Sequence, residues 1–478
     1  MNIFEMIKKE TAHLGIRTAV IDEQRRISYS RLILAAEQVA DTLRSKGVER
    51  LHRVGLLCDD SIDYIVASLA ILSLSAVIVP ISTDQTAEEI DTVIDRIDVD
   101  FMVAERGLYR GDDGEELTTP GFQEKSFSIV KRMVKAQPCD GYCRVNPAFI
   151  RFSSGTTGMS KGVVLSHEAI VERTDAADRG LRITSDDVVL WVLSMSYHFV
   201  VTIILFLRRG ATIVLCGRRY PNSLIEGITR HQGTFIYGSP FYYSLLARTD
   251  LLQRDALSRI RLAVSTTTKL PEQVAEEFSA RFGFELAEAY GIIEVGLPFI
   301  RLDGGAAKRS SVGRPLPGFE VRLDNQGLEG VGEISIKGKG MLDAYFSPWM
   351  GRESLLIDGW FRTGDLGKID EDGFLFIVGR NSEVINFVGM KVFAQEVEAV
   401  LNRHPLVAES QVYGVPHEQY GQLPTAKVVL QTGAAVDDIA DDLRRFCYQR
   451  LAQYKVPKFF EFVSALPKTA SGKIKRQL

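Results

Sequence analysis

The segment Phe149-Ile-Arg-Phe-Ser-Ser-Gly-Thr-Thr-Gly-Met-Ser-Lys-Gly162 gives the strongest indication of the fold. Its first four residues are apolar enough to predict a buried strand. The ten residues that follow combine glycines, hydroxyl side chains and Lys161, so they predict a loop that can surround a polyphosphate with N–H groups, hydroxyls and one cation. The spacing is not that of a P-loop, because Ser160 stands where that pattern needs a glycine before the lysine. An isolated loop of this composition would be a solvated turn.

Around this stretch, short β-rich apolar runs alternate with amphipathic segments of helical length. This alternation predicts an α/β domain with largely parallel sheets. The predicted strands include residues 53–57, 76–79, 149–152, 211–215 and 235–237, and the predicted helices include 30–45, 167–177 and 271–282. From Gly332 the pattern changes to short strands and turns, with an Asp372-Gly373 hairpin signal. We therefore predict a large N-terminal domain, residues 1–380, and a small C-terminal α+β domain, residues 381–478.

Composition excludes several classes of protein. A chain of 478 residues with 45% hydrophobic residues is too long for one ordinary core. The net charge of -4 lacks the basic excess of a nucleic-acid binder. Five scattered cysteines indicate reduced thiols and a cytoplasmic enzyme. Cys139 and Cys143 could form half of a metal site, but no second Cys/His pair lies near them in the sequence.

Two uncharged runs, residues 64–83 and 188–207, have the length of membrane spans. The first breaks at serines and ends in a strand-like segment, so it predicts a buried helix followed by a buried strand. The second has Ser194, Ser196 and His198 at its centre, which is costly in lipid. The amphipathic N-terminus is too charged for a signal peptide. We expect a soluble enzyme without a transmembrane segment, with peripheral membrane contact left open.

Further motifs follow in a fixed order, and together they carry a resemblance. They are Tyr290-Gly-Ile-Ile-Glu294, Gly359-Trp-Phe-Arg-Thr-Gly-Asp-Leu-Gly367, Gly379-Arg380 with Gly389-Met-Lys-Val and Gln395-Glu-Val-Glu398, and Pro467-Lys-Thr-Ala-Ser-Gly-Lys-Ile-Lys-Arg476. With the loop at 153–162, they resemble the adenylate-forming superfamily of acyl-CoA synthetases, peptide-synthetase adenylation domains and luciferases. The resemblance covers nearly the whole chain and is strongest to acyl-CoA synthetases. It implies an N-terminal domain that includes a distorted barrel and a mobile C-terminal lid.

The resemblance also implies roles for particular residues. Lys473 would neutralise charge where a carboxylate attacks the α-phosphorus of ATP; as an isolated feature, the same tail would be a solvated basic segment. Glu294 would bind Mg2+. Asp365 would accept the ribose hydroxyls, or would only stabilise its turn, and Arg380 would contact the nucleotide and begin the hinge. The implied catalytic residues are Lys473, His198 and Glu294. The implied cofactor-binding residues are Ser153, Ser154, Gly155, Thr156, Thr157, Gly158, Lys161, Thr267, Thr268, Glu288, Ala289, Tyr290, Gly291, Ile293, Asp365, Ile377, Arg380, Lys391 and Gly389.

The sequence departs from the family pattern at several positions. Ile293 replaces the threonine that offers a hydroxyl to the α-phosphate. Ser160 stands where proline is usual, and Ser382 stands where the hinge acid or lysine is expected. The glycine-rich adenine loop becomes Ser265-Thr-Thr-Thr-Lys-Leu270, whose β-branched residues should narrow the adenine pocket or the acyl pocket.

The segment Met195-Ser-Tyr-His198-Phe resembles the one that lines the acyl site in the family. Amino-acid-activating members carry an aspartate near it, and residues 190–208 contain none. An unpaired buried ammonium would be costly, so we predict an apolar or aryl acid. The alternative interpretation of His198 is a packed core histidine.

We therefore predict an ATP- and Mg2+-dependent acid–thiol ligase that forms an acyl-AMP, releases pyrophosphate and transfers the acyl group to CoA. A pantetheinylated carrier protein is the alternative acceptor. A catalytically impaired homologue acting as a binding module is the third hypothesis, motivated by Ile293 and Ser382. No nucleic-acid partner is expected, and the sequence does not determine the oligomeric state.

Overall fold

The computed structural model describes the chain except residues 110–113, 135–138, 153–160, 218, 328–329, 389, 432–438, 469–472 and 477–478. The described residues form two compact units. The first comprises residues 1–320 and 337–361, and the second comprises 321–336 and 362–478. The predicted domain boundary at 380/381 is the boundary of a lid that moves as a whole. It stays a prediction.

The first sheet of the larger unit has nine strands with a parallel centre, where β8 and β5 flank β4 and β3. Its order is β19 (Met350–Gly351), β18 (Ala344–Tyr345), β9 (Gly162–Ser166), β8 (Pro147–Phe152), β4 (Val77–Ile81), β3 (Arg53–Leu57), β5 (Phe101–Glu105), β7 (Phe127–Lys131) and β6 (Glu115–Leu117). The strand predicted at 149–152 therefore leads from the interior of this sheet directly into the glycine-rich segment.

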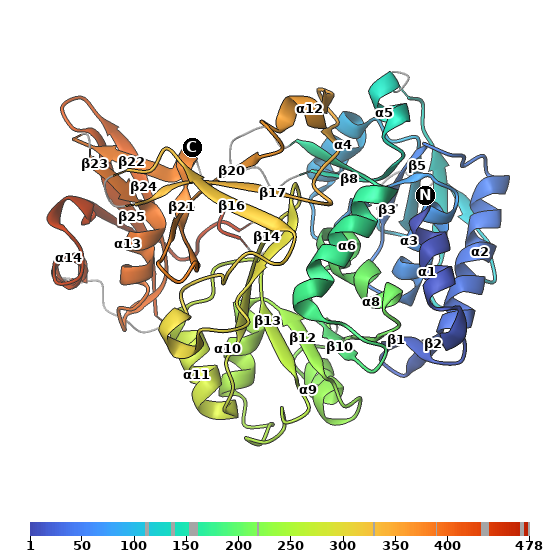
Figure 1. Ribbon diagram of the computed structural model, residues 1–478, viewed down its shortest axis with the longest axis horizontal. Helices are drawn as coiled ribbons and strands as arrows, with labels where there is room; N and C mark the ends of the chain where they lie inside the picture. Colours follow the sequence, from blue (N-terminus) through green and yellow to red (C-terminus); the bar gives the residue numbers. More distant parts are fainter. Residues whose placement is uncertain are drawn as a thin grey trace. The chain divides into compact units, whose positions relative to one another are not determined.

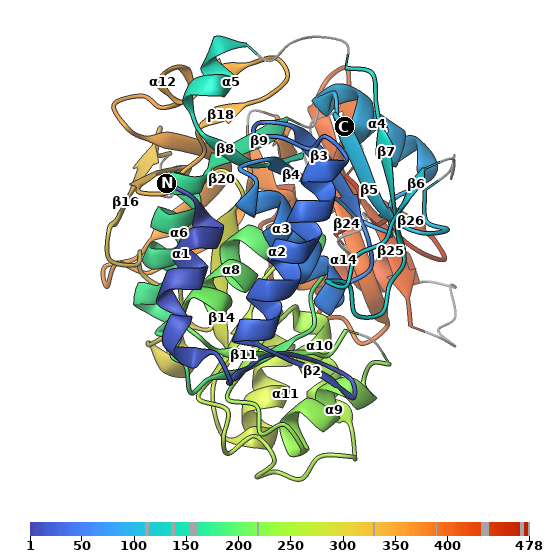
Figure 2. The same cartoon turned by 90° about the vertical axis from the view of Figure 1, so that its right-hand side faces the viewer.

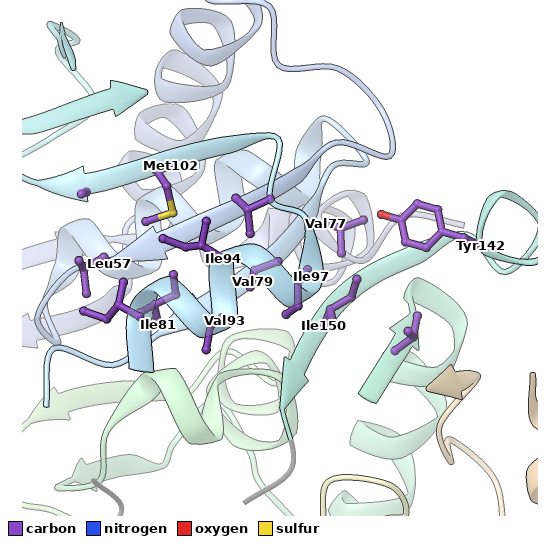
Figure 3. Close-up of a cluster of buried hydrophobic side chains, with 14 of the residues drawn as sticks. Leu57, Val77, Val79, Ile81, Val93, Ile94, Ile97, Met102, Tyr142 and Ile150 are labelled. Carbon is purple, nitrogen blue, oxygen red and sulfur yellow. The ribbon is translucent and has the colours of Figure 1, made fainter. Parts of the chain in front are cut away.

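Helix α4 (Ala87–Ile97) shows why this sheet acquires a covered face. Thr86 closes a capping box with Glu89 at its N-terminus. The residues buried along it repeat at the helical spacing and are Ile90, Val93, Ile94 and Ile97. They pack on Val79 and Ile81 of β4 and on Met102 of β5, as Figure 3 shows. The end of β4 is thereby fixed beside β8.

The second sheet of this unit has eight strands, and its interior pairs are all parallel. Its order is β15 (Gly296–Ile300), β14 (Ala287–Ile292), β13 (Leu262–Ser265), β12 (Phe235–Gly238), β10 (Val188–Trp191), β11 (Thr212–Leu215), β1 (Thr18–Asp22) and β2 (Arg25–Ser28). Parallel neighbours bring the carboxyl ends of β12, β13 and β14 to one edge. Of the residues predicted to contact the nucleotide, Thr267 and Thr268 follow the end of β13, and Glu288 to Gly291 lie in β14.

Helices cover both sheets of this unit, with α2 beside α3 and α1 beside α3 (Figures 1 and 2). They are α1 (Ile3–Glu10), α2 (Tyr29–Ser45), α3 (Ile62–Ser73), α4, α5 (Asp140–Arg144), α6 (His167–Leu181), α7 (Met195–His198), α8 (Ile204–Arg208), α9 (Asn222–Thr229), α10 (Pro240–Arg248), α11 (Glu272–Phe282) and α12 (Arg352–Leu355). The run at 64–83 forms buried α3 followed by buried β4, as the sequence predicts. In the described part of the chain, no helix is both long and apolar enough to span a membrane.

The smaller unit contains two sheets. One has the order β16 (Phe319–Asp324), β17 (Gly332–Gly338), β20 (Phe361–Ile369) and β21 (Leu375–Arg380). The other has β23 (Met390–Phe393), β22 (Val384–Phe387), β25 (Gly421–Leu430) and β24 (Val407–His417), with β26 (Phe459–Phe462) beside β25. Helices α13 (Ala394–Leu401) and α14 (Ile439–Tyr448) pack on this second sheet through Val397, Leu401 and Leu443. The predicted hairpin at Asp372-Gly373 joins β20 to β21, and Gly373 has a φ of 82°.

Candidate functional site

Glu294, the predicted metal ligand, lies in the tight turn between β14 and β15. The Tyr345 hydroxyl donates to Glu294 Oε1 at 3.3 Å. The Lys161 Nζ lies 4.8 Å from the centroid of the same Tyr345 ring. Burial and the nearby Glu294 carboxylate raise the pKa of Tyr345, so its phenol remains a donor. Tyr345 therefore brings together two predicted site residues that lie more than a hundred positions apart in the chain.

Arg173 of α6 fixes the backbone of this turn. Its Nη1 donates to the Ile293 carbonyl at 3.1 Å, and its Nε and Nη2 donate to the Gly340 carbonyl at 3.0 and 2.7 Å. Burial lowers the pKa of Arg173 to about 10, which still leaves it protonated at neutral pH. Glycine is required at position 340, since a Cβ there would lie 2.4 Å from the backbone nitrogen of Arg173. These contacts link the main chain just before Glu294 to the backbone at Gly340.

Glu288, Thr267 and Thr268 form a second group of predicted residues, at the ends of β13 and β14. The Leu270 N–H donates to Glu288 Oε1 at 2.8 Å, and Glu288 Oε2 has no hydrogen-bond partner among the described residues. Burial raises the pKa of Glu288 to about 7. Thr267 has a φ of 75°, a left-handed conformation that is a true outlier for a β-branched residue.

Tyr290, Ala289 and Gly291 continue from Glu288 along β14. The Tyr290 ring lies 6.1 Å from that of Phe299 on the antiparallel strand β15, and Ala289 is buried. A Cβ at Gly291 would lie 2.3 Å from the Gly296 carbonyl oxygen, so only glycine fits there. The motif that the sequence singles out is therefore held by close backbone approach across this strand pair.

His198 ends α7 in an aromatic environment. Its ring centroid is 5.9 Å from that of Trp191 and 6.4 Å from that of Tyr237. A single π-helical turn, Phe199–Ile203, follows it, and such turns are frequent at functional sites. His198 is half-buried. The two interpretations of this residue, acyl-site lining and packed histidine, both remain open.

In the smaller unit, Asp365 and Arg380 are direct partners across the antiparallel pair β20–β21. Arg380 Nε lies 3.0 Å from Asp365 Oδ1, and Asp365 is 5% exposed. The Thr363 hydroxyl accepts from the Asp365 N–H at 3.1 Å and donates to the Ile334 carbonyl at 2.9 Å. Strand register therefore brings together two predicted site residues that are fifteen positions apart in the sequence.

The remaining predicted residues of this unit lie on other elements. Ile377 is on β21 opposite Gly367. Lys391 is exposed on β23 opposite Asn386. Lys473 is half-buried, beside the isolated antiparallel bridge between Lys468 and Ile474. Residues 153–160 and Gly389 lie outside the described residues.

Comparison with known proteins identifies the family. Residues 8–346 match the family described as AMP-binding enzyme, and residues 396–473 match the AMP-binding enzyme C-terminal domain. This chain belongs to the AMP-binding enzyme family. The predicted membership of the adenylate-forming superfamily and the predicted fold are thereby confirmed.

Individual relatives of this AMP-binding enzyme cover nearly its whole length. The benzoate–CoA ligase of Thauera aromatica is 30% identical to it, over 94% of this chain and 88% of that protein. A Rhodococcus jostii (strain RHA1) CoA ligase named for 3-[(3aS,4S,7aS)-7a-methyl-1,5-dioxo-octahydro-1H-inden-4-yl]propanoate is 29% identical, over 99% and 97%. Among solved structures, ATP-bound MatB from Rhodopseudomonas palustris has a TM-score of 0.85 at 26% identity, covering 99% and 97%. These relatives confirm the prediction of an AMP-forming acid ligase.

Two residues of the site in this AMP-binding enzyme were not identified from the sequence. Tyr345 and Arg173 lie in no recognised motif. The pairing of β18 with β9 places Tyr345 opposite Val163, near Lys161, and the Leu342 N–H donates to the Glu294 carbonyl; neither long-range contact has a local sequence signal. In the described residues no group of three or more His, Cys, Asp or Glu side chains could hold a metal ion, so the idea of half a metal site at Cys139 and Cys143 gains no further ligand.

Proposed function

We propose that this AMP-binding enzyme joins an apolar or aryl carboxylic acid to CoA through an acyl-AMP. The similarity to CoA ligases over nearly the whole chain carries the proposal. The aromatic surroundings of His198, with Trp191 and Tyr237, support an acid with a flat or apolar body. Residues 190–208 offer no carboxylate to pair with a substrate ammonium.

In this proposal the nucleotide is bound by the residues that the family resemblance implies. Asp365 accepts the ribose hydroxyls, with Arg380 holding its carboxylate in place. Lys161 and the segment 153–160 bind the phosphates. Lys473 supplies the positive charge that the meeting of two anions requires at the reacting phosphorus.

Glu294 fits a Mg2+ ion that also binds the phosphates of ATP. Mg2+ is commonly held by one or two carboxylates, with waters and phosphate oxygens completing its shell. Glu294 is an oxygen ligand fixed through its backbone by Arg173, and the Leu342 N–H donates to its carbonyl at 2.7 Å. A single anchored carboxylate of this kind matches the donor set that a phosphate-bound Mg2+ needs. The ion would neutralise phosphate charge.

An acid-library assay tests the proposal. Pyrophosphate release should require ATP and an apolar or aryl acid, and acyl-thioester should form with free CoA. A pantetheinylated carrier protein presents the same thiol without the CoA nucleotide, so it is the matched acceptor control. Thioester formation on the carrier protein alone would favour the alternative acceptor. Pyrophosphate release with amino acids only would contradict the proposed substrate class.

A further inference from the structure

Arg476, near the end of the chain, is held between two carboxylates of the smaller unit. Its Nη1 and Nη2 donate to Glu398 Oε1 and Oε2 at 2.9 and 2.8 Å. Its Nε lies 3.3 Å from Glu383 Oε2. The side chains of Arg476, Glu383 and Glu398 are 17%, 11% and 9% exposed. We call these three residues the Arg476 cluster; it is a bidentate, largely buried arrangement, the strong kind of ion pair.

The Arg476 cluster joins segments that are distant in sequence. Glu398 lies on α13, and its Oε1 also accepts from the Val412 N–H of β24 at 2.7 Å. Glu383 ends the short 3-10 turn Asn381–Glu383 and directly follows Ser382. A cavity of about 130 Å³ is lined by Ser382, Glu383 and Arg476, among others. The cavity thus lies beside the contact between Glu383 and Arg476 and borders the backbone at Ser382.

The segment that contains Lys473 is attached to the same place. Lys468 and Ile474 form an antiparallel bridge, and the Lys475 N–H donates to the Pro467 carbonyl at 2.7 Å. The Lys475 carbonyl accepts from Gln411 Nε2 at 3.3 Å. Arg476 is three residues beyond Lys473. Its bidentate contact with Glu398 therefore fixes the backbone from which the Lys473 side chain extends.

We propose that Arg476 is a positioning residue for Lys473 and that Glu383 links this anchor to the pivot at Ser382. The proposal rests on the proposed function of Lys473 in adenylation. A displacement of about 1 Å at a reacting group can cost on the order of a hundredfold in rate. Loosening the anchor should therefore slow adenylation selectively, because thiol transfer from preformed acyl-AMP does not use the Lys473 charge.

The central experiment replaces Arg476 by Lys in the full-length enzyme. Lysine keeps the charge but cannot make two parallel hydrogen bonds to one carboxylate. We expect the kcat of acyl-AMP formation to fall at least tenfold, with the KM for ATP and the rate of thioester formation from supplied acyl-AMP within threefold of wild type. The double variant Arg476→Lys/Lys473→Ala should be no slower than Lys473→Ala, because the two residues act as one unit. Equal losses in both half-reactions, or additive losses in the double variant, would overturn the positioning role.

Glu383→Gln is the second variant, and it serves if Arg476→Lys fails to fold. Glutamine keeps the shape of the glutamate side chain. The variant should lower adenylation in the same selective manner, and loss of both half-reactions together would contradict the link to the pivot. Lys468→Met is the matched control, since Lys468 pairs with Glu409 at 3.0 Å on the same segment but is 49% exposed. It should leave both half-reactions unchanged.

Amide hydrogen exchange tests whether Arg476 fixes the backbone near Lys473, independently of the role assigned to Lys473 in adenylation. Exchange at residues 473–476 should be at least several-fold faster in Arg476→Lys than in wild type, and unchanged in Lys468→Met. Unchanged exchange in Arg476→Lys would overturn the anchor, whatever the kinetics. A wild-type adenylation rate in Lys473→Ala would instead overturn the function proposed for Lys473.

Discussion

Thr267 has a strained backbone conformation. A β-branched residue in the left-handed region costs on the order of 1–3 kcal/mol, and Thr267 has a φ of 75° where the family's adenine loop carries glycine. Thr267→Gly should relieve this strain, offset by the greater backbone entropy of glycine in the unfolded chain. We expect a rise of about 1 kcal/mol in the free energy of unfolding, measured by urea titration. Thr268→Gly, a change at the next and exposed position, is the control; an equal rise there would contradict the strain argument.

Glu288 should make stability depend on pH. Its carboxyl has a pKa of about 7 in the folded protein against an ordinary value of 4.5, because burial disfavours the charged form. The unfolded chain therefore releases this proton first, and the stabilising contribution of the protonated form is lost as pH rises from 4.5 to 7. At 1.36 kcal/mol per pKa unit, the loss approaches about 3 kcal/mol.

Comparing wild type with Glu288→Gln across this range isolates the Glu288 contribution. Glutamine keeps an oxygen to accept from the Leu270 N–H but cannot ionise. The difference in unfolding free energy between the two proteins should shift in favour of the variant as pH rises from 4.5 to 7. A difference that is constant with pH would show that folding does not raise the pKa of Glu288.

Replacing Ile293 distinguishes an active enzyme from a catalytically impaired homologue. The carbonyl of Ile293 is already used by Arg173, and the Ile293 side chain offers no hydroxyl to the α-phosphate. Ile293→Thr should raise the rate of acyl-AMP formation several-fold if nothing replaces that hydrogen bond, the effect of about 1 kcal/mol. A flat or lower rate, together with measurable turnover of the wild type, would remove the argument for impairment. Pyrophosphate exchange is the measurement, and Ile293→Val is the control for packing.

Among the structural elements, the connection after β21, with the pivot predicted at residues 380–382, is the feature to test. In the proposed function, the two half-reactions use different groups of residues 381–478, so we expect this segment to rotate about residues 380–382. Ser382→Pro fixes φ at the pivot and should impair one half-reaction at least several-fold more than the other. Ser382→Ala, which leaves φ free, should impair neither. Equal effects of Ser382→Pro on adenylation and thioester formation would count against this pivot.

Local patterns predicted the elements well where the chain contributes one continuous signal. The helix expected at 30–45 is α2, and the hairpin at Asp372-Gly373 joins β20 to β21. The Asp365–Arg380 pair follows from that hairpin, because its register is set by the turn. The Tyr345–Glu294 contact and the Arg476–Glu398 pair depend on pairings across 51 and 78 residues, which no local period reports. The segment around Lys473, whose composition alone predicts a solvated basic tail, is partly buried. It is buried by such long-range contacts, which no local period reports.

For the whole molecule, nucleotide binding should be visible as stabilisation. A ligand that binds only the folded state at one hundred times its Kd adds about 2.7 kcal/mol. ATP with Mg2+ should therefore raise the thermal unfolding midpoint of the wild type, and ATP with a chelator should raise it less. In Glu294→Gln the difference between the two conditions should disappear. Asp365→Asn is the control, since it should weaken stabilisation with and without metal. A full metal-dependent shift in Glu294→Gln would show that Glu294 does not bind the ion.

The smaller unit is discontinuous, because residues 321–336 belong to it together with residues 362–478. This feature has a consequence for gene recombination between homologues. A crossover at 361/362 would pair β17 of one parent with β20 of the other, so mismatched side chains would meet inside one sheet. A crossover at 380/381 takes β16, β17, β20 and β21 whole from a single parent. Viable hybrids of such genes should therefore have their junctions concentrated after Arg380, and few between Ile336 and Arg362.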